Sequence, residues 1–260
     1  MMKSVYSTLT IAYRDILKFF RDPGRIVATF IFPAIFIVIL GKGLQTGVGQ
    51  HLSFDLLTFT FTGVLAQTMF QSAASGVVSL IEDRENDFSQ EIFVSPISRY
   101  VIIFGKILGE STLALFQAIG IVIIGLLIGA EMSVSQLVSV IPVLGLACLF
   151  GAAFGVLVLS NLSSQRAANQ IFPFILFPQF FLAGIFSPIN NLPWYLDILS
   201  KIAPLTYIVD LIRNVYYSAS NQLSYVTVYP LWLDLTVVTG MFLVFIVIGT
   251  WLFVRNEKNK

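Results

Sequence analysis

The sequence predicts an all-α membrane protein with six transmembrane helices, an interfacial amphipathic helix at its N-terminus and a re-entrant helical hairpin on the outer side, between the fifth and sixth spans. Composition is the first reason: 57% of the 260 residues are hydrophobic and 11% are charged, with a mean hydropathy of +0.86. Soluble domains carry about 25% charged residues. The second reason is that the apolar residues gather in runs near the roughly 20 residues that a helix needs to cross a bilayer. We therefore expect residues 1–260 to form one transmembrane domain.

The first expected element is an amphipathic helix over residues 3–22. Its apolar residues recur at three- and four-residue steps, as the stripe of a surface helix requires, at Val5, Leu9, Ala12, Ile16 and Phe19 or Phe20. Its cations can reach anionic lipid head groups from the interface, namely Lys3, Arg14, Lys18 and Arg21. Asp22-Pro23-Gly24 then ends the helix. An ordinary cytoplasmic cap is the alternative interpretation.

The apolar runs predict six spans, in chain order 26–44, 56–81, 102–129, 137–160, 171–187 and 231–254. The fifth run is the shortest and contains Pro173 and Pro178. Proline is tolerated within a membrane where neighbouring helices satisfy the freed backbone groups. G-x-x-x-G patterns at 105–109, 125–129 and 151–155 allow helices to approach closely. We expect this packing to occur within one subunit.

Lysine and arginine are divided unequally between the two sides of this topology. Twelve lie on the side of the termini, at Lys3, Arg14, Lys18, Arg21, Arg25, Arg84, Arg99, Lys106, Arg166, Arg255, Lys258 and Lys260. Three lie on the other side, at Lys42, Lys201 and Arg213. Because basic residues favour the cytoplasmic side, both termini and the loop 82–100 are expected in the cytoplasm. The expected location is the inner (cytoplasmic) membrane.

The segment between the second and third spans is rich in charge. Five acids fall within ten residues, at Glu82, Asp83, Glu85, Asp87 and Glu91, with Arg84, Arg99 and Lys106 among or after them. On an otherwise apolar chain, such a loop is where a membrane protein meets a soluble partner. Lys106 and Glu110 are spaced i, i+4 and could neutralise each other.

The outer segment 187–230 holds two apolar runs, 194–202 and 205–215, that are too short to span. They are bounded by Pro188, Pro193 and Pro204. Aromatic residues suited to the head-group region accompany them, namely Trp194, Tyr195, Tyr207, Tyr216 and Tyr217. We expect two short helices that dip into the outer leaflet and return, with Asp210 and Arg213 paired. A structured external loop is the alternative.

The sequence lacks the residue patterns that ATP binding, metal binding and nucleic-acid binding would require. The phosphate-binding pattern G-x-x-x-x-G-K-[ST] is absent, so ATP binding of that kind is not expected in this chain. The sole histidine, His51, falls in a short outer loop, and no His/Cys/Asp cluster has metal-ligand spacing. The sole cysteine, Cys148, is expected to be a packing residue. A net charge of +1 gives no reason to expect a nucleic-acid partner.

The charged loop resembles that of the permease subunits of type 2 ABC exporters. The resemblance rests on Glu82, on 88–91, on the turn Val94-Ser95-Pro96-Ile97-Ser98-Arg99 and on Gly105-Lys106. Further matching residues, in the family's order, are Arg14, Arg21-Asp22-Pro23, Pro33, 184–188, 192–193, 203–207, Asp210 and Arg213. The resemblance covers nearly all of the chain. One departure is Phe88-Ser89-Gln90-Glu91, where the family often has a Gly-Thr pair before the acid.

The resemblance implies a transport subunit without enzymatic activity of its own. Two copies, as a homodimer, would pair with two copies of an ABC ATP-binding subunit, which would hold ATP and magnesium; this chain would need no cofactor. The cargo would be an amphiphile, such as a drug, a lipid or a lipid-linked glycan, moved outward along a path lined by spans one, two and five. The expected coupling residues are Glu82, Asp83, Arg84, Glu85, Asp87, Phe88, Glu91, Pro96 and Arg99. Those of the outer hairpin are Pro188, Pro193, Trp194, Pro204, Tyr207, Asp210 and Arg213.

Other classes of membrane protein remain as alternatives. A secondary carrier or a channel not coupled to ATP would need ionisable residues deep in the bundle, and the spans contain few. An intramembrane enzyme would need catalytic groups that the chain lacks. A receptor-like or scaffold protein could share the fold.

Overall fold

The computed structural model describes residues 2–47, 52–85, 99–162, 164–190 and 192–258. These residues form helices and turns, with no strand among them. The helices are α1 Met2–Phe20, α2 Pro23–Phe36, η1 Ile37–Gly43, α3 Leu56–Gly76, α4 Ser79–Glu85, α6 Arg99–Ile128, α7 Val134–Leu159, α8 Gln165–Leu182, α9 Trp194–Ile202, α10 Pro204–Tyr216, α11 Leu223–Val226 and α12 Leu231–Lys258.

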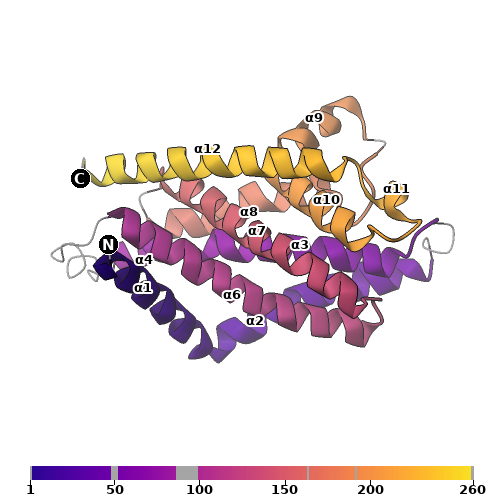
Figure 1. Cartoon of the computed structure of the whole chain (residues 1–260), viewed down its shortest axis with the longest axis horizontal. Coiled ribbons are helices and arrows are strands. Elements are labelled where there is room, and N and C mark those ends of the chain that lie inside the picture. The colour runs from indigo at the N-terminus through magenta and orange to yellow at the C-terminus, as the bar shows by residue number, and fades with distance from the viewer. Residues whose placement is uncertain (1, 48–51, 86–98, 163, 191, 259–260) are drawn as a thin grey trace.

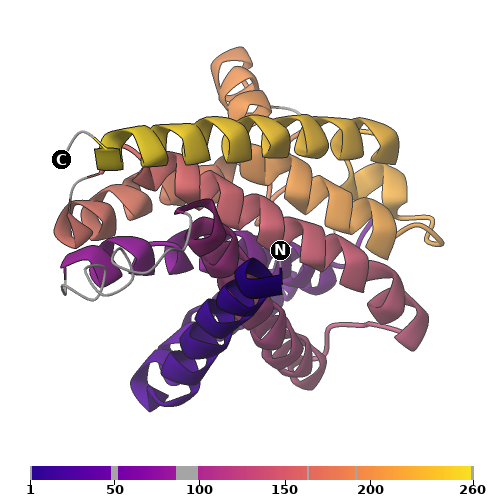
Figure 2. The same ribbon diagram turned by 60° about the vertical axis from the view of Figure 1, so that its left-hand side comes forward.

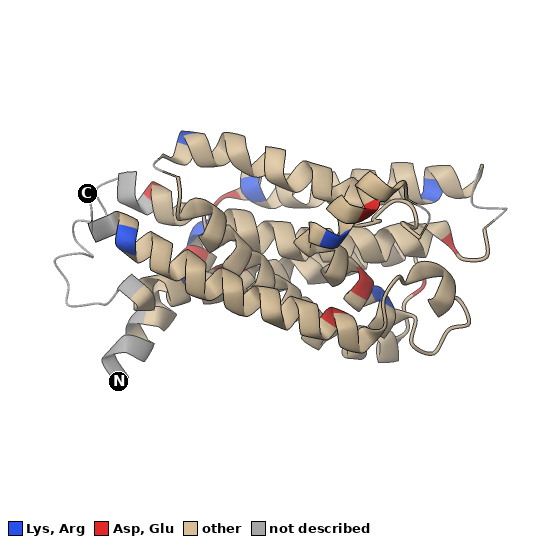
Figure 3. Ribbon diagram, turned by 90° about the horizontal axis from the view of Figure 1, so that it is seen from above, with Lys and Arg blue, Asp and Glu red and all other residues tan. Residues whose placement is uncertain are grey.

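The long helices run between two ends of the molecule (Figure 1). The start of α1, the segment α4 and the end of α12 gather at one end, and α9, α10 and α11 lie at the other. Charged residues are concentrated toward these two ends, with a stretch between them that is free of charge along the ribbons (Figure 3). This arrangement agrees with the prediction that both termini and the charged loop share one side.

Five helical segments are long and apolar enough to cross a bilayer: Pro23–Gly43, Leu56–Glu82, Tyr100–Ile128, Val134–Leu159 and Leu223–Asn256. Five of the six predicted spans are therefore confirmed as apolar helices of sufficient length. The fifth predicted run, 171–187, corresponds to α8, which begins at Gln165 and ends at Leu182. Because its first turns are polar, α8 lacks the long apolar stretch of the others, and the count of six spans is not confirmed.

Local sequence signals set where the helices begin. Asp22 caps α2 by accepting a hydrogen bond from the Arg25 amide at 3.0 Å, and Pro23 occupies the first turn, where its missing N–H costs nothing. Asp55 caps α3 in the same way. Ser133 and Gln136 form a reciprocal capping box at the start of α7. The predicted break at residues 22–24 is confirmed, because α1 ends at Phe20 and α2 begins at Pro23.

The core surrounds α3, which is buried along nearly its whole length against α6, α7, α10 and η1. Gly151 and Gly155 of α7 lie against the backbone of Phe70 and Ala74 in α3, where an added Cβ would come closer than 3.0 Å. The G-x-x-x-G pattern at 151–155 therefore packs within one subunit, as predicted. Cys148, in the same helix, is buried as predicted.

The N-terminal segment is helical, as predicted, and α1 packs along α6. Gly105 and Gly109 of α6 permit this approach, because a Cβ at either position would press on α1. Two cations that were expected to reach lipid lie in ion pairs instead: Arg14 with Asp15 at 3.1 Å, and Lys18 with Glu82 at 2.6 Å. The location of α1 at the membrane interface stays a prediction.

The outer segment contains the two short helices expected, α9 and α10. They differ in burial: α10 is buried against α3, α7, α8 and α12, whereas α9 exposes most of its apolar residues. Figure 2 shows α9 projecting from the body of the molecule while α10 lies within it. Re-entry of this hairpin into the outer leaflet stays a prediction.

Candidate functional site: a groove between α2, α3 and α8

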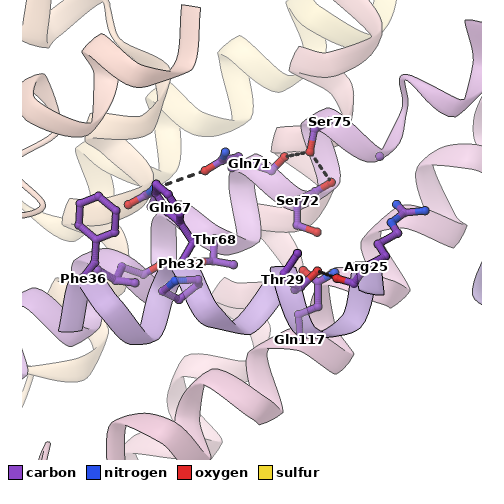
Figure 4. A pocket seen from close by; sticks show the side chains of 14 residues that line it. Arg25, Thr29, Phe32, Phe36, Gln67, Thr68, Gln71, Ser72, Ser75 and Gln117 are labelled. Carbon is purple, nitrogen blue, oxygen red and sulfur yellow. Dashed lines mark hydrogen bonds between the residues drawn. The ribbon is translucent and has the colours of Figure 1, made fainter. Parts of the chain in front are cut away.

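Two hollows of about 330 and 300 Å³ adjoin one another between α2, α3 and α8. They share Phe32, Gln71 and Ser75, so together they form one groove, which we call the α2–α3–α8 groove. Gln117 of α6 closes its floor, and Figure 4 shows the residues that line the larger hollow. The helices α2, α3 and α8 correspond to the predicted runs one, two and five; that a transport path follows this groove stays a prediction.

One wall of the groove is polar and belongs to α3. Its residues recur at three- and four-residue steps, so they share one face of the helix, namely Gln67, Thr68, Gln71, Ser72 and Ser75. The Gln67 side-chain amide donates to the Gln71 side-chain oxygen at 3.3 Å. The Thr68 and Ser75 hydroxyls donate to the carbonyls of Val64 and Gln71. Their lone pairs therefore stay available toward the groove.

The opposite wall is aromatic. Phe32 and Phe36 of α2 stand 4.9 Å apart between ring centroids, and Phe177 and Phe180 of α8 stand 5.9 Å apart. Phe172 adds a buried ring to the α8 side. A groove with one hydrogen-bonding wall and one aromatic wall can bury the two halves of an amphiphile at once.

Two amide groups in the groove have unused hydrogen-bonding capacity. The Oε1 atoms of Gln67 and Gln117 are buried and have no hydrogen-bond partner, and each residue is 4% exposed. Buried polar atoms are nearly always paired, and both residues line the larger hollow, so a water or polar group that entered it could pair with these oxygens.

A cation stands at the end of the groove nearest the charged loop. Arg25 lines the larger hollow from the first turn of α2. Its guanidinium carbon lies 5.5 Å from the centroid of the Phe19 ring, a cation–π distance. Within the part of the chain that the structure describes, this guanidinium pairs with no carboxylate.

A buried polar cluster lies behind the same end. Lys106 of α6 pairs with Asp15 of α1 at 2.9 Å and donates to the Ser79 hydroxyl of α4 at 3.0 Å. Ser79 donates in turn to Glu110 at 3.4 Å. The Glu110 carboxyl group packs over Gly76, which lines the groove. The cluster of Asp15, Ser79, Lys106 and Glu110 therefore connects α1, α4 and α6 with the groove. It also places more ionisable groups inside the bundle than the sequence analysis expected.

A family model described as ABC-2 type transporter matches residues 6–217. The chain belongs to the ABC-2 type transporter family. The transport permease ycf38 of Porphyra purpurea is 26% identical over 247 residues, which cover 92% of this chain and 84% of that protein. Nodulation protein J of Rhizobium meliloti is 23% identical over 194 residues, or 74% of each chain. YbhR of Escherichia coli, named as a multidrug ABC transporter permease, is 29% identical over 168 residues, 63% of this chain and 44% of that protein.

Membership makes the chain a multi-pass membrane subunit of a transporter, of a family whose members are transport subunits and not enzymes. The family implies association with a separate ABC ATP-binding subunit. The ATP-binding pattern missing from the sequence is consistent with this division of labour.

Of the nine residues predicted to couple this ABC-2 permease to its ATPase, four lie outside the described part of the chain and four more have side chains that are not described. Glu82 is described, and its carboxylate forms an ion pair with Lys18 of α1. Asp83, Arg84 and Glu85 lie on α4, and Arg99 begins α6, but their side chains are not described. The remaining four, together with His51, lie outside the described residues: Asp87, Phe88, Glu91 and Pro96.

The outer hairpin of the permease is organised by Asp210 and Arg213, but not as an ion pair. The Asp210 carboxylate accepts hydrogen bonds from the amides of Val228 at 2.9 Å and Tyr229 at 2.7 Å. Arg213 donates to the carbonyls of Phe59 at 3.2 Å and Ile185 at 3.4 Å. The predicted pairing of Asp210 with Arg213 is therefore wrong, because among the described residues each side chain bonds to backbone groups and no ion pair joins the two; the Nε of Arg213 is left without a partner.

Arg213 also lies 3.6 Å above the Phe59 ring, which ties α10 to α3. Burial lowers the pKa of Arg213 to about 10, so the guanidinium keeps its charge at neutral pH. Asn214 donates to Asp234 of α12 at 2.9 Å. These bonds fix α10 to the spans on two sides.

The other predicted hairpin residues are spread along the segment. Tyr207 donates its hydroxyl to the carbonyl of Lys201 at 2.8 Å and stacks on Tyr229. Pro204 occupies the first turn of α10, and Pro193 precedes α9. Trp194 is exposed at the start of α9, and Pro188 lines a small hollow beside Asp210.

The polar wall of the groove was not predicted from the sequence. Its pattern is visible there, since 67, 68, 71, 72 and 75 are all Gln, Ser or Thr at helical spacing within an apolar span. Neutral amides and hydroxyls are cheaper to bury than charges, so they are the groups with which a membrane path can be lined.

Proposed function

We propose that this chain is the membrane-embedded half of an ATP-driven exporter that moves an amphiphilic compound outward along the α2–α3–α8 groove. The observation that carries the proposal is the groove itself, with amides and hydroxyls on α3 facing aromatic rings on α2 and α8. Such a groove matches a molecule with a polar head and an apolar body, such as a drug, a lipid or a lipid-linked glycan.

Coupling to the ATPase would pass through the segment 82–100. Its first residue, Glu82, holds α1 through Lys18, and the cluster of Asp15, Ser79, Lys106 and Glu110 continues from α4 to the edge of the groove. A ligand-driven change needs contacts that differ between two states. Here ATP and magnesium, bound in the partner, would supply that difference by moving the segment, and this chain would need no cofactor.

The functional unit would be a homodimer with two ATP-binding subunits. The α2 and α8 sides of the groove expose aromatic residues that a second copy could cover, including Phe32, Phe174, Phe177 and Phe181. Two grooves facing each other would enclose one path. In this arrangement α8 crosses the bilayer as the fifth of six spans.

The twelve-to-three division of basic residues supports cytoplasmic termini in the inner membrane, with α9 and α10 on the outer side as a re-entrant hairpin. Labelling tests this orientation. Asn221→Cys places a thiol at an exposed position, whereas the native Cys148 is buried. A membrane-impermeant maleimide should label the variant in intact cells. Labelling only in inverted vesicles would contradict the topology.

Coupling is tested by co-purification. The variant carrying Glu85→Lys with Asp87→Lys should lose the ATP-binding subunit during purification in mild detergent, and ATP-dependent transport into inverted vesicles should stop. Glu131→Lys is the matched control, because Glu131 is an exposed acid between α6 and α7, away from α4. If the reversed variant keeps both its partner and its transport rate, the coupling assignment is wrong.

A secondary carrier is the second candidate, and the buried cluster of Asp15, Lys106 and Glu110 is the observation that favours it. Buried ionisable groups inside a membrane bundle are typical of proton-coupled transporters. The two candidates separate in proteoliposomes that hold the permease alone. Uptake driven by a pH gradient, without the ATP-binding subunit, would favour the carrier.

A further inference from the structure

The chemistry of the α2–α3–α8 groove narrows the class of amphiphile. We infer that the groove binds an anionic amphiphile whose head group also carries hydroxyls. The anion binds Arg25, and the hydroxyls donate to the amide oxygens of Gln67 and Gln117. The hydrocarbon lies against Phe32 and Phe177. This inference rests on the proposed function for the location of the path, and it adds the charge and the hydrogen-bonding character of the cargo.

We infer the negative charge of the cargo from Arg25. Three cations near this end have carboxylate partners, Arg14 and Lys106 with Asp15 and Lys18 with Glu82, whereas the exposed Arg21, which does not line the groove, has none among the described residues. Arg25 has a ring beside it and no ion pair in the described residues.

The acids nearest to Arg25 are already engaged. Asp22 caps α2 by accepting a hydrogen bond from the Arg25 amide. Glu110 lies behind Gly76 within the buried cluster, where it is attracted by the charge of Arg25 without forming an ion pair with it. A cation at the end of a groove in a membrane protein is best compensated by a guest anion, for which the planar guanidinium is suited.

We infer the hydroxyls of the cargo's head group from the unpaired side-chain oxygens of the groove. Gln67 and Gln117 line the groove, and the Oε1 atom of each is buried without a hydrogen-bond partner, whereas the Thr68 and Ser75 hydroxyls donate to carbonyls of their own helix. This wall therefore offers unpaired acceptors that can bind O–H or N–H donors. A head group with the anion at Arg25 and hydroxyls along α3 satisfies both requirements.

We infer the hydrocarbon part of the cargo from the aromatic wall of the groove. Phe32 and Phe177 are 56% and 53% exposed, although both line the groove. In a bilayer such rings face acyl chains. A soluble phosphorylated polyol would leave them uncovered, so the cargo is an amphiphile. A zwitterionic amine would satisfy the acceptors but would bring a second cation toward Arg25, so it fits less well.

The full chain, purified alone in a non-ionic detergent, is sufficient for the test. Native mass spectrometry measures the retention of phosphatidylinositol, phosphatidic acid and phosphatidylcholine, three lipids that differ in charge and hydroxyl content. We expect phosphatidylinositol to bind best, then phosphatidic acid, then phosphatidylcholine. The preference for phosphatidylinositol over phosphatidylcholine should be about tenfold, as one charge-assisted hydrogen bond supports.

The variants separate the two features of the head group. Arg25→Gln should remove the preference for phosphatidic acid over phosphatidylcholine and leave phosphatidylinositol only the part of its preference that its hydroxyls provide. Gln67→Leu with Gln117→Leu should remove the preference for phosphatidylinositol over phosphatidic acid and leave the preference for phosphatidic acid over phosphatidylcholine. Arg21→Gln is the matched control, because Arg21 is exposed near the same end and does not line the groove. It should bind as the wild type does.

Four outcomes would overturn the inference. The wild type could show no lipid preference, or Arg25→Gln could bind as the wild type does. Arg21→Gln could lose as much as Arg25→Gln, which would indicate binding by surface charge. Soluble inositol 1-phosphate could compete as well as phosphatidylinositol, which would exclude a role for the hydrocarbon. Because the ATP-binding subunit is absent from this test, its failure leaves the co-purification result intact, and the reverse holds as well.

Discussion

Two helices of nearly equal hydropathy have opposite surroundings in this molecule. The most apolar stretch of Pro23–Gly43 has a mean hydropathy of 2.2 and that of Val134–Leu159 has 2.4, yet 17% of the first and 67% of the second is buried. α7 packs on α3 through glycines, whereas α2 lines a groove with bulky rings. The difference teaches that hydropathy locates a membrane helix but does not tell whether its neighbours are protein, lipid or cargo.

The largest expected effect concerns the buried cluster that connects the packed side with the groove. Lys106→Met removes the buried cation that faces Asp15, 4% exposed, and leaves the carboxylate with the partly exposed Arg14 at 3.1 Å. We expect a loss of about 3 kcal/mol in the free energy of unfolding, the lower end of the range for a buried ion pair that loses one partner. Unfolding in mixed dodecylmaltoside and SDS micelles, followed by far-UV circular dichroism, measures it.

The matched control is Lys18→Met, which breaks the half-exposed pair with Glu82. It should cost less than about 1 kcal/mol, as exposed ion pairs do. Asp15→Asn combined with Lys106→Met should recover much of the stability lost in the single variant. If Lys106→Met is no more destabilised than Lys18→Met, the cluster is not a buried junction.

The next effect tests the packed side. In Gly151→Leu the new side chain meets the backbone of Phe70 in α3. We expect a loss of about 1–3 kcal/mol, because overpacking forces two helices apart. The same unfolding assay applies. Gly145→Leu, on the same helix but with open space around its Cβ, should change stability by no more than about 0.5 kcal/mol. Equal losses at 145 and 151 would contradict the close packing of α3 with α7.

The third effect tests the groove wall. Gln67→Leu with Gln117→Leu removes two buried acceptors that have no partner. Stability should stay the same or rise by about 1 kcal/mol, because two unpaired buried acceptors are removed and the hydrogen bond lost is the long one from Gln67 to Gln71 at 3.3 Å, while transport in reconstituted vesicles should fall. Unfolding and transport are measured on the same preparation. A destabilised double variant with normal transport would make this wall part of the core and not of the path.

The smallest effect tests the lipid side of α8. Phe174→Ala truncates a ring that is 82% exposed. We expect a change within about 0.5 kcal/mol in the single chain. Phe172→Ala, two residues earlier and 4% exposed, should lose about 3–5 kcal/mol, as buried aromatic truncations do. Thermal unfolding in detergent compares the two. Similar losses would mean that α8 is covered on both faces.

Much of the fold could be predicted from local signals. The break at Asp22 and Pro23, the helix over 194–202 and the close packing at 151–155 all follow from residues adjacent in sequence, and the structure confirms them. The limits of α8 did not follow, because Ser164 caps a helix that begins in a polar stretch before the apolar run. Caps act on the backbone whatever the hydropathy of the residues that follow.

Long-range partners could not be predicted. The spacing of Asp210 and Arg213 suggested a pair, yet the carboxylate binds amides at Val228 and Tyr229, eighteen and nineteen residues further along the chain. The family resemblance indicated the three spans that line the groove, but not which face of each. That face depends on how α2, α3 and α8 rotate about their axes in the bundle, which the intervening packing decides.

The seven residues of η1 continue α2 with the wider turn of a π-helix. Gly41 within it sits against Leu57 of α3, so this stretch is held in place. If η1 tightened to α-helical geometry, each residue gained or lost would turn the preceding helix by about 100°. Phe32 and Phe36 would then rotate about the axis of α2 while η1 stayed packed against α3. A local change in the helical turn of η1 would thus open or close the groove without unfolding α2.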